Sequence, residues 1–243
     1  MQLLSVSSDA KTIKGEKKGY LTGILYLLPA DSSGITNVCS YATPGCKASC
    51  LNTAGRGAFS SVQQGRMRKT KWLIESPETF YPQLMHDIRL LVKQAKTQGL
   101  KPCVRLNGTS DLPRLVNAVA VHFPKVRFYD YSKIPQPWKR TAMLPNYHLT
   151  FSYSENNAVD CLECLEHGIN VAMVFDTKRG QPLPKTWCNY KVIDGDLSDL
   201  RFKDPKGVIV GLRAKGRAKK DCTGFVVRLE NLKAPLVQIT GAQ

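Results

Sequence analysis

The stretch Gly-Ile-Leu-Tyr-Leu-Leu at residues 23–28 decides the fold that the sequence predicts. Its bulky apolar residues are followed by Pro29 and Gly34, a pattern that favours a buried strand leading into a loop. That loop carries three thiols, in the segment Cys39-Ser-Tyr-Ala-Thr-Pro-Gly-Cys46-Lys-Ala-Ser-Cys50. A strand that places reactive side chains at its carboxyl end is typical of α/β barrels.

Six further apolar runs follow, at residues 102–106, 126–130, 148–152, 170–175, 190–193 and 207–211. Segments between them, such as 113–122 and 156–167, have helical length and apolar spacing, which implies parallel strands joined by crossover helices. Helices are also expected over 60–74 and from an N-cap at Ser76 to Gly99. We therefore expect a single α/β domain over residues 21–243, a partial or complete (β/α) barrel with parallel strands, preceded by a basic N-terminal arm at 1–20.

The charge of the chain points to a polyanionic partner. Its 35 Lys and Arg residues against 19 Asp and Glu give a formal net charge of +16, which makes nucleic acid, DNA or RNA, the first candidate. A charge spread evenly over a solvated surface is the alternative. The clustered cations expected to contact nucleic acid are Arg56, Arg66, Arg68, Lys69, Lys71, Arg213, Lys215 and Arg217.

The sequence has neither an uninterrupted apolar stretch of roughly 18 residues nor the layout of a secretory signal. We expect a soluble cytoplasmic protein with no membrane partner. Its eight cysteines are then expected to be reduced thiols, some of them metal-bound, rather than a disulfide framework.

Polar clusters follow the predicted strands, and in a barrel such clusters meet at one rim and build one pocket. The candidate catalytic residues among them are Asp111, Asp130, Lys133, Glu155 and Asp194. The ordinary alternative is that Asp, Asn, Ser and Gly are good turn formers, which applies above all to Asn107-Gly108 and Asp194-Gly195-Asp196.

Cys39, Cys46 and Cys50 are candidate metal ligands, because thiolates bind zinc, copper(I) or iron–sulfur clusters. Three protein ligands leave one coordination position open, as a catalytic centre requires. The alternative is that these thiols fill space in a packed loop. We expect Cys103 to be structural, since it lies within a predicted strand.

The chain resembles phage proteins of the gene product eighty-eight family. The resemblance rests on residues 42–46 and 50–56, on 104–111 and 128–133, and on 207–216. It implies a viral origin, and so the host cytoplasm if a phage encodes the protein, together with one shared fold, and it names no reaction.

A cysteine-rich loop after the first strand, followed by strands with polar ends, also resembles the layout of radical S-adenosylmethionine enzymes. The gaps between the three cysteines are six and three residues here, against three and two in that superfamily. The resemblance implies that Cys39, Cys46 and Cys50 hold three irons of an iron–sulfur cluster and leave the fourth for S-adenosylmethionine. It implies that residues 107–111, with Asn107, Thr109 and Ser110, bind the amino group of that cofactor.

Three functions are compatible with these features. The first is a metal- or iron–sulfur-dependent enzyme that acts on nucleic acid or nucleotides, for instance in base modification. The second is a base-exchanging transglycosylase or glycosylase with a strand-end carboxylate and structural zinc. The third is a non-catalytic nucleic-acid-binding protein, in which basic residues contact phosphates and aromatic residues such as Phe59, Trp72, Tyr129, Tyr131 and Trp138 stack on bases.

Overall fold

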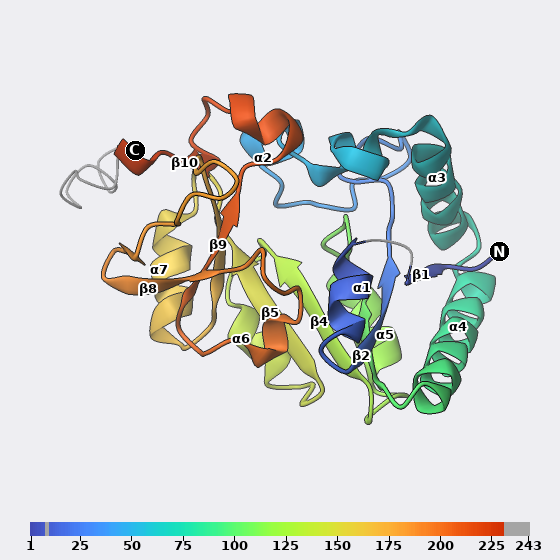
Figure 1. The fold of residues 1–243 in the computed structure, drawn as a ribbon. Helices are drawn as coiled ribbons and strands as arrows, with labels where there is room; N and C mark the ends of the chain where they lie inside the picture. The colour runs from blue at the N-terminus through green and yellow to red at the C-terminus, as the bar shows by residue number, and fades with distance from the viewer. Residues whose placement is uncertain (8–9, 231–243) are drawn as a thin grey trace.

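A mostly parallel β-sheet forms the centre of the protein (Figure 1). The structure is a computed structural model that describes residues 1–7 and 10–230. Within these residues the strands lie in the order β1-β2-β3-β4-β5-β6-β9-β8-β7, with β10 paired to β6. Their bounds are β1 (Leu4–Val6), β2 (Tyr20–Leu25), β3 (Lys101–Arg105), β4 (Arg127–Ser132), β5 (Tyr147–Ser152), β6 (Val171–Phe175), β7 (Thr186–Trp187), β8 (Tyr190–Asp194), β9 (Ile209–Arg213) and β10 (Val226–Val227).

The α/β class and the seven predicted strands are confirmed, as β2, β3, β4, β5, β6, β8 and β9. These strands pair in parallel with their neighbours. The expectation of a complete barrel is not met, because the described sheet is open. Closure would pair the outer edges of β2 and β8, and these edges are instead taken by the antiparallel strands β1 and β7.

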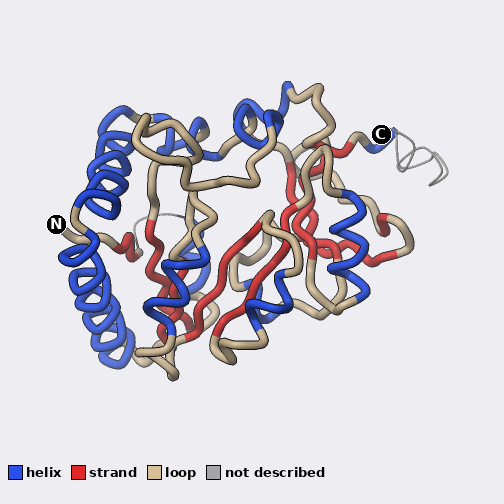
Figure 2. The backbone as a smooth tube through the Cα atoms, turned by 180° about the vertical axis from the view of Figure 1, so that it is seen from behind, coloured by secondary structure: helices blue, strands red, loops and turns tan. Residues whose placement is uncertain are grey.

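Helices and short 3-10 turns connect the strands. The helices are α1 (Ala10–Glu16), α2 (Pro44–Ala48), α3 (Ser60–Glu75), α4 (Pro77–Thr97), α5 (Pro113–Ala120), α6 (Pro137–Thr141) and α7 (Ala158–Glu166). The 3-10 turns are η1 (Leu51–Thr53), η2 (Gly55–Ala58), η3 (Arg201–Lys203) and η4 (Gly216–Lys220). In Figure 2, α5, α6 and α7 lie in front of the sheet, whereas α1 lies in front of it in the opposite view of Figure 1.

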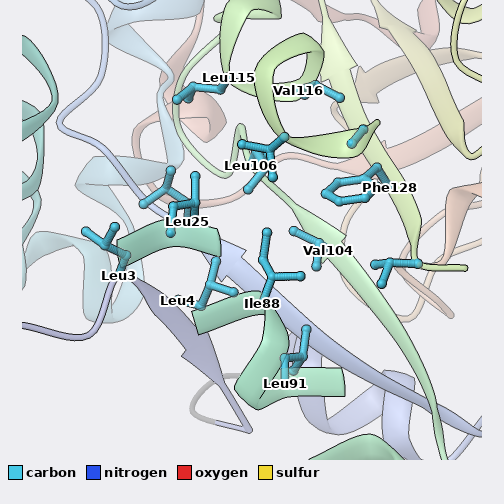
Figure 3. Close-up of a cluster of buried hydrophobic side chains, with 14 of the residues drawn as sticks. Leu3, Leu4, Leu25, Ile88, Leu91, Val104, Leu106, Leu115, Val116 and Phe128 are labelled. Atoms are coloured by element: carbon cyan, nitrogen blue, oxygen red, sulfur yellow. The ribbon is translucent and has the colours of Figure 1, made fainter. Parts of the chain in front are cut away.

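The largest core lies between the sheet and helices α4 and α5. Helix α4 buries an apolar stripe whose members recur every three or four residues: Phe80, Leu84, Ile88, Leu91 and Ala95. Ile88 and Leu91 project towards Val104 of β3, and Phe128 of β4 belongs to the same cluster (Figure 3). This packing fixes the direction of both strands, so it also fixes where their carboxyl ends lie.

The other face of the sheet is covered by the segment around η3. Side chains alternate along β3, so that Val104 faces the helices while Cys103 packs on Leu200. Arg105 faces the same way as Cys103 and forms a buried ion pair with Asp199, with 3.0 Å between Nη1 and Oδ2. The segment around η3 therefore covers one end of this face, whereas loops lie at the carboxyl ends of the strands.

Residues 1–20, expected as a basic arm, contain the edge strand β1 and the helix α1. The backbone N–H groups of Leu3 and Leu4 donate to Asp87 of α4, which ties the start of the chain to the core. Within residues 1–7 and 10–230, no helix has both the length and the apolar composition needed to cross a membrane.

Candidate functional site

A cavity of about 440 Å³ opens among the loops at the carboxyl ends of the parallel strands. It gathers residues from the loop after β2, the loop after β3, the end of β4 and the end of β9. Ten of the sequence-predicted site residues line it: Cys39, Cys46, Cys50, Asn107, Thr109, Ser110, Asp111, Lys133, Arg213 and Lys215. The convergence expected of strand-end clusters is thus present for the loop after β3 and for the three thiols.

Cys39 is held by the loop that follows β3. Its thiol donates to the backbone oxygen of Thr109 at 3.6 Å, and the backbone N–H of Asp111 donates to Val38, the residue before Cys39, at 2.8 Å. Gly108 lets the turn after β3 lie close to the end of β2, because a Cβ there would lie 2.8 Å from the backbone oxygen of Leu25. The two loops are therefore joined along their length.

Cys46 is held from the opposite side by Glu155, which follows β5. The carboxylate of Glu155 accepts hydrogen bonds from the Thr43 hydroxyl and from the backbone N–H of Gly45, both at 2.7 Å. Thr43 in turn caps α2, since its hydroxyl accepts the backbone N–H of Cys46 at 3.2 Å. Glu155, predicted as catalytic, does not line the cavity and instead positions the segment that carries Cys46.

Cys50 is held by α3. Arg66, which is buried, donates to the side-chain oxygen of Asn52, and the backbone N–H of Asn52 donates to the Cys50 sulfur at 3.5 Å. The guanidinium of Arg66 also lies 4.9 Å from the centre of the Tyr26 ring. Each of the three thiols therefore has an anchor in a different part of the fold.

Asn107 organises the turn after β3 through its amide. The amide oxygen accepts the Ser110 hydroxyl at 2.9 Å and the backbone N–H of Leu112 at 2.8 Å. The Thr109 hydroxyl donates to the backbone oxygen of Leu27 at 2.5 Å. The side chains of the predicted cofactor-binding residues are thus engaged within the protein, so the turn presents a rigid outline to the cavity.

Asp130 lies behind this turn and outside the cavity lining. It is fully buried, and it accepts the backbone N–H of Asn107 at 2.8 Å and the Asn107 amide at 3.3 Å. Burial raises the pKa of Asp130 to about 7, and this effect exceeds the opposing effects of Arg105 and of the hydrogen bonds from Asn107. Asp130 therefore supports Asn107 from below.

Asp111 and Lys133 are the two predicted catalytic residues that line the cavity. Asp111 Oδ2 accepts the backbone N–H of Lys133 at 2.8 Å and the Ser132 hydroxyl at 3.2 Å. Burial raises the pKa of Asp111 despite these hydrogen bonds. The Lys133 ammonium lies 5.5 Å from the centre of the Phe225 ring, which the sequence had not marked as a site residue. These groups offer an acid, an amine and an aromatic face to a bound molecule.

Arg213 is enclosed by carboxylates at the far wall. Its Nη1 lies 2.9 Å from Asp194 and 3.1 Å from Asp196, and Lys215 lies 2.6 Å from Asp196. Asp194, predicted as catalytic, does not line the cavity and serves as a partner of Arg213. Both carboxylates thus neutralise cations that the sequence marked for phosphate contact.

The remaining residues predicted to contact nucleic acid differ in their exposure to solvent. Arg66 is buried, and the half-buried Lys69 donates to the backbone oxygen of Leu3 at 2.6 Å. Lys71 is exposed and lies 3.8 Å from Glu75 on the same helix. Arg56, Arg68 and Arg217 are exposed. Among these residues, a large anion can therefore reach the side chains of Arg56, Arg68, Lys71 and Arg217.

The eight cysteines, all within the described residues, are free. Burial raises the pKa of Cys39 to about 12 and also raises the pKa of Cys50, so these thiols are protonated at neutral pH in the protein alone. In the described part of the chain, no three His, Cys, Asp or Glu side chains are already arranged around a single metal ion. Cys103, Cys161 and Cys164 are buried in the cores, as expected of structural thiols.

Thr43 and Gly45, like Phe225, are site residues that sequence reasoning missed. The order Thr43-Pro44 before a short helix is an N-cap followed by proline at the first helical position, so the helix itself was readable. The contact with Glu155 was not readable, because 112 positions separate it from Thr43 along the chain.

Comparison with known proteins identifies one family. The profile of the family described as Gene product 88 matches residues 2–228. No curated protein and no solved structure matches the chain.

Proposed function

The chain belongs to the Gene product 88 family, and from its site we propose that it is an enzyme that holds an iron–sulfur cluster on Cys39, Cys46 and Cys50 and acts on nucleic acid or a nucleotide. The observation that carries the proposal is that three free thiols line the same cavity as Asp111, Lys133 and the turn at 107–111.

The donor set fits a cluster. Three thiols supply the soft ligands that iron–sulfur centres require, and they leave one position open for a reactant. The thiols of a multi-iron cluster bind different irons, so they need not surround a single point as the ligands of one ion do.

The radical S-adenosylmethionine layout gives the cluster a role. With that cofactor bound, such a cluster would supply hydrogen-abstraction chemistry, and the protein would orient and shield the reactants. Here the rigid turn at Asn107 shapes one wall of the cavity, and Lys133 with Phe225 shapes another. Asp111 is the cavity carboxyl best placed to hold a proton, since its pKa is raised.

The charge of the chain supports a nucleic-acid or nucleotide substrate. Of the six cations that line the cavity, Lys47, Arg105, Arg213 and Lys215 form ion pairs with Asp31, Asp199, Asp194 and Asp196, and Lys14 and Lys133 are the two additional positive charges. This excess has the same sign as the formal net charge of +16. A site with this balance attracts phosphate-bearing molecules.

Iron and sulfide analysis of protein purified without oxygen tests the proposal, together with an ultraviolet–visible spectrum. We expect iron with broad absorption near about 400 nm, the region in which thiolate-bound clusters absorb. Cys46→Ala should lose the iron. Cys103→Ala is the matched control, because Cys103 is buried on the sheet beside Thr22, and it should retain the iron. Equal iron in the two variants, or no iron in the wild type, would refute the cluster.

A second candidate is the transglycosylase or glycosylase with structural zinc. Asp111 favours it, because this carboxyl lines the cavity whereas Asp130 and Asp194 do not. In that reaction the carboxylate attacks the sugar or stabilises its cationic transition state. Zinc in place of iron, with base exchange that depends on Asp111, would favour this function.

A further inference from the structure

Three large hydrophobic side chains near the opening of the cavity are exposed to solvent. Tyr41, Leu51 and Phe59 have exposed fractions of 50%, 51% and 60%. Leu51 itself lines the cavity, and Tyr41 adjoins Ala42, which also lines it. Phe59 follows η2, which packs on η1: a Cβ on Gly57 would lie 2.8 Å from the backbone oxygen of Leu51. The three residues therefore lie on segments that line or adjoin the cavity.

A basic segment from the far end of the chain lies against the same segments. A Cβ on Gly216 would lie 2.8 Å from the Cβ of Ala54, between η1 and η2, and Ala218 of η4 lines the cavity. Three residues of η4 are exposed cations: Arg217, Lys219 and Lys220. Both segments lie at the end of the sheet near α2 (Figure 1). We call Tyr41, Leu51, Phe59, Arg217, Lys219 and Lys220 the rim surface.

The composition of the rim surface selects one kind of partner. Aromatic and apolar side chains beside cations bind unpaired bases, since the rings stack on base faces while the cations contact phosphates. A base pair within a duplex hides its faces in the stack, and a cavity of about 440 Å³ has room for a single nucleotide and not for a duplex. Other aromatic side chains pack against rings within the protein: Trp72 against Phe80, and Trp138 against His167.

We propose that the rim surface binds single-stranded nucleic acid and brings one unpaired nucleotide to the cavity. This inference rests on the proposed function for what happens in the cavity, but the binding itself needs neither metal nor cofactor. Single-stranded DNA and single-stranded RNA share the base faces and phosphates that the rim surface recognises.

Fluorescence anisotropy with labelled oligonucleotides tests the proposal on the full chain. The probes are a single-stranded DNA, a single-stranded RNA of the same sequence and the corresponding DNA duplex. We expect the wild type to prefer one or both single strands over the duplex. Phe59→Ser should weaken single-strand binding about tenfold, the effect of losing one stacked base, and leave duplex binding unchanged.

Phe59→Ser is informative because Phe59 occupies the N-cap of α3 without a capping hydrogen bond from its side chain. Serine is a favoured N-cap residue, so the substitution does not weaken the helix. Met143→Ser is the matched control: Met143 is 82% exposed and precedes β5, at the opposite end of the sheet. It should bind as the wild type does.

Equal single-strand affinities for the wild type and Phe59→Ser, or a wild type that binds the duplex as tightly as the single strands or more tightly, would overturn the proposal. The iron analysis is independent of this result. Protein that lacks iron and still prefers single strands would refute the cluster and support the rim surface. Protein that contains iron and binds duplex as tightly as single strands would support the cluster and refute the rim-surface proposal.

Discussion

Glu155 Oε1 accepts a hydrogen bond from the backbone N–H of Gly45 at 2.7 Å, and this contact ties the loop after β5 to the loop that carries the three thiols. The second oxygen of Glu155 accepts the Thr43 hydroxyl at the same distance. One carboxylate therefore fixes both Thr43, the N-cap of α2, and Gly45, the residue directly before Cys46.

Replacing Glu155 with alanine should lower the free energy of unfolding by about 2 kcal/mol, because two hydrogen bonds to a charged group are lost. Urea denaturation measures this change. Amide hydrogen exchange should also become faster at residues 43–46 than in the rest of the chain. Glu166→Ala, at the exposed end of α7, should leave both measurements at wild-type values.

Gly45→Ala should be strongly destabilising. A Cβ at Gly45 would overlap the Thr223 hydroxyl and lie 2.8 Å from Glu155 Oε1, so the loop, its anchor or both must move. Gly65→Ala is the matched substitution in the middle of α3, where the nearest atom would be 3.9 Å away. It should raise stability by up to about 1 kcal/mol through helix propensity. Thermal unfolding of the two variants should shift in opposite directions.

Asp130 should make stability depend on pH between about 4 and 7. Burial raises its pKa to about 7 in the folded protein, against about 3.9 in an unfolded chain, so the folded state binds the proton more tightly. Its contribution to stability is complete below about pH 4 and is lost as the pH rises through about 7.

The test compares the wild type with Asp130→Asn, since asparagine keeps an oxygen that can accept the backbone N–H of Asn107. The unfolding free energies of the two proteins are measured in urea at several pH values. As the pH rises from about 4 to about 7, that of the wild type should fall relative to that of Asp130→Asn. A difference that is constant with pH would show that Asp130 keeps an ordinary pKa.

Alanine substitutions at Arg66 and Arg68 should have different effects on stability, although the two residues lie two positions apart on α3. Arg66→Ala removes a buried guanidinium that holds Asn52 and covers Tyr26, and it should cost about 3 kcal/mol of stability. Arg68→Ala, at an exposed position, should change stability by at most about 0.5 kcal/mol. If nucleic acid contacts Arg68, this variant should bind it with a shallower salt dependence. Denaturation and salt-dependent anisotropy on both variants measure these effects.

The central strands could be predicted because continuous apolar runs such as 171–175 are buried on both faces of the sheet. The edge strands could not. β1 and β7 have three and two residues, too few to show a period. The position of β9 between β6 and β8 also left no local signal, because pairing order depends on contacts between distant segments.

The cavity was predictable in outline and not in detail. Parallel strands end at one edge, so the thiols and the turn at 107–111 were expected to meet. Which carboxyl group faces the cavity depends on side-chain direction and on nearby donors. Asp130 points to Asn107, Asp194 to Arg213 and Glu155 to Gly45. In the same way, a run of basic residues does not reveal that Arg66 is buried.

The anchors of the thiol loop also set the order in which the site can mature on the ribosome. Gly45 leaves the ribosome 110 residues before its partner Glu155, and Thr223 and Gly216, which complete the packing around the loop, are made later still. During synthesis Cys50 therefore gains its anchor first, through Arg66 of α3, and Cys39 gains the loop after β3 next, whereas the segment that carries Cys46 waits for Glu155. The packing around the three thiols is consequently completed by the last part of the described chain.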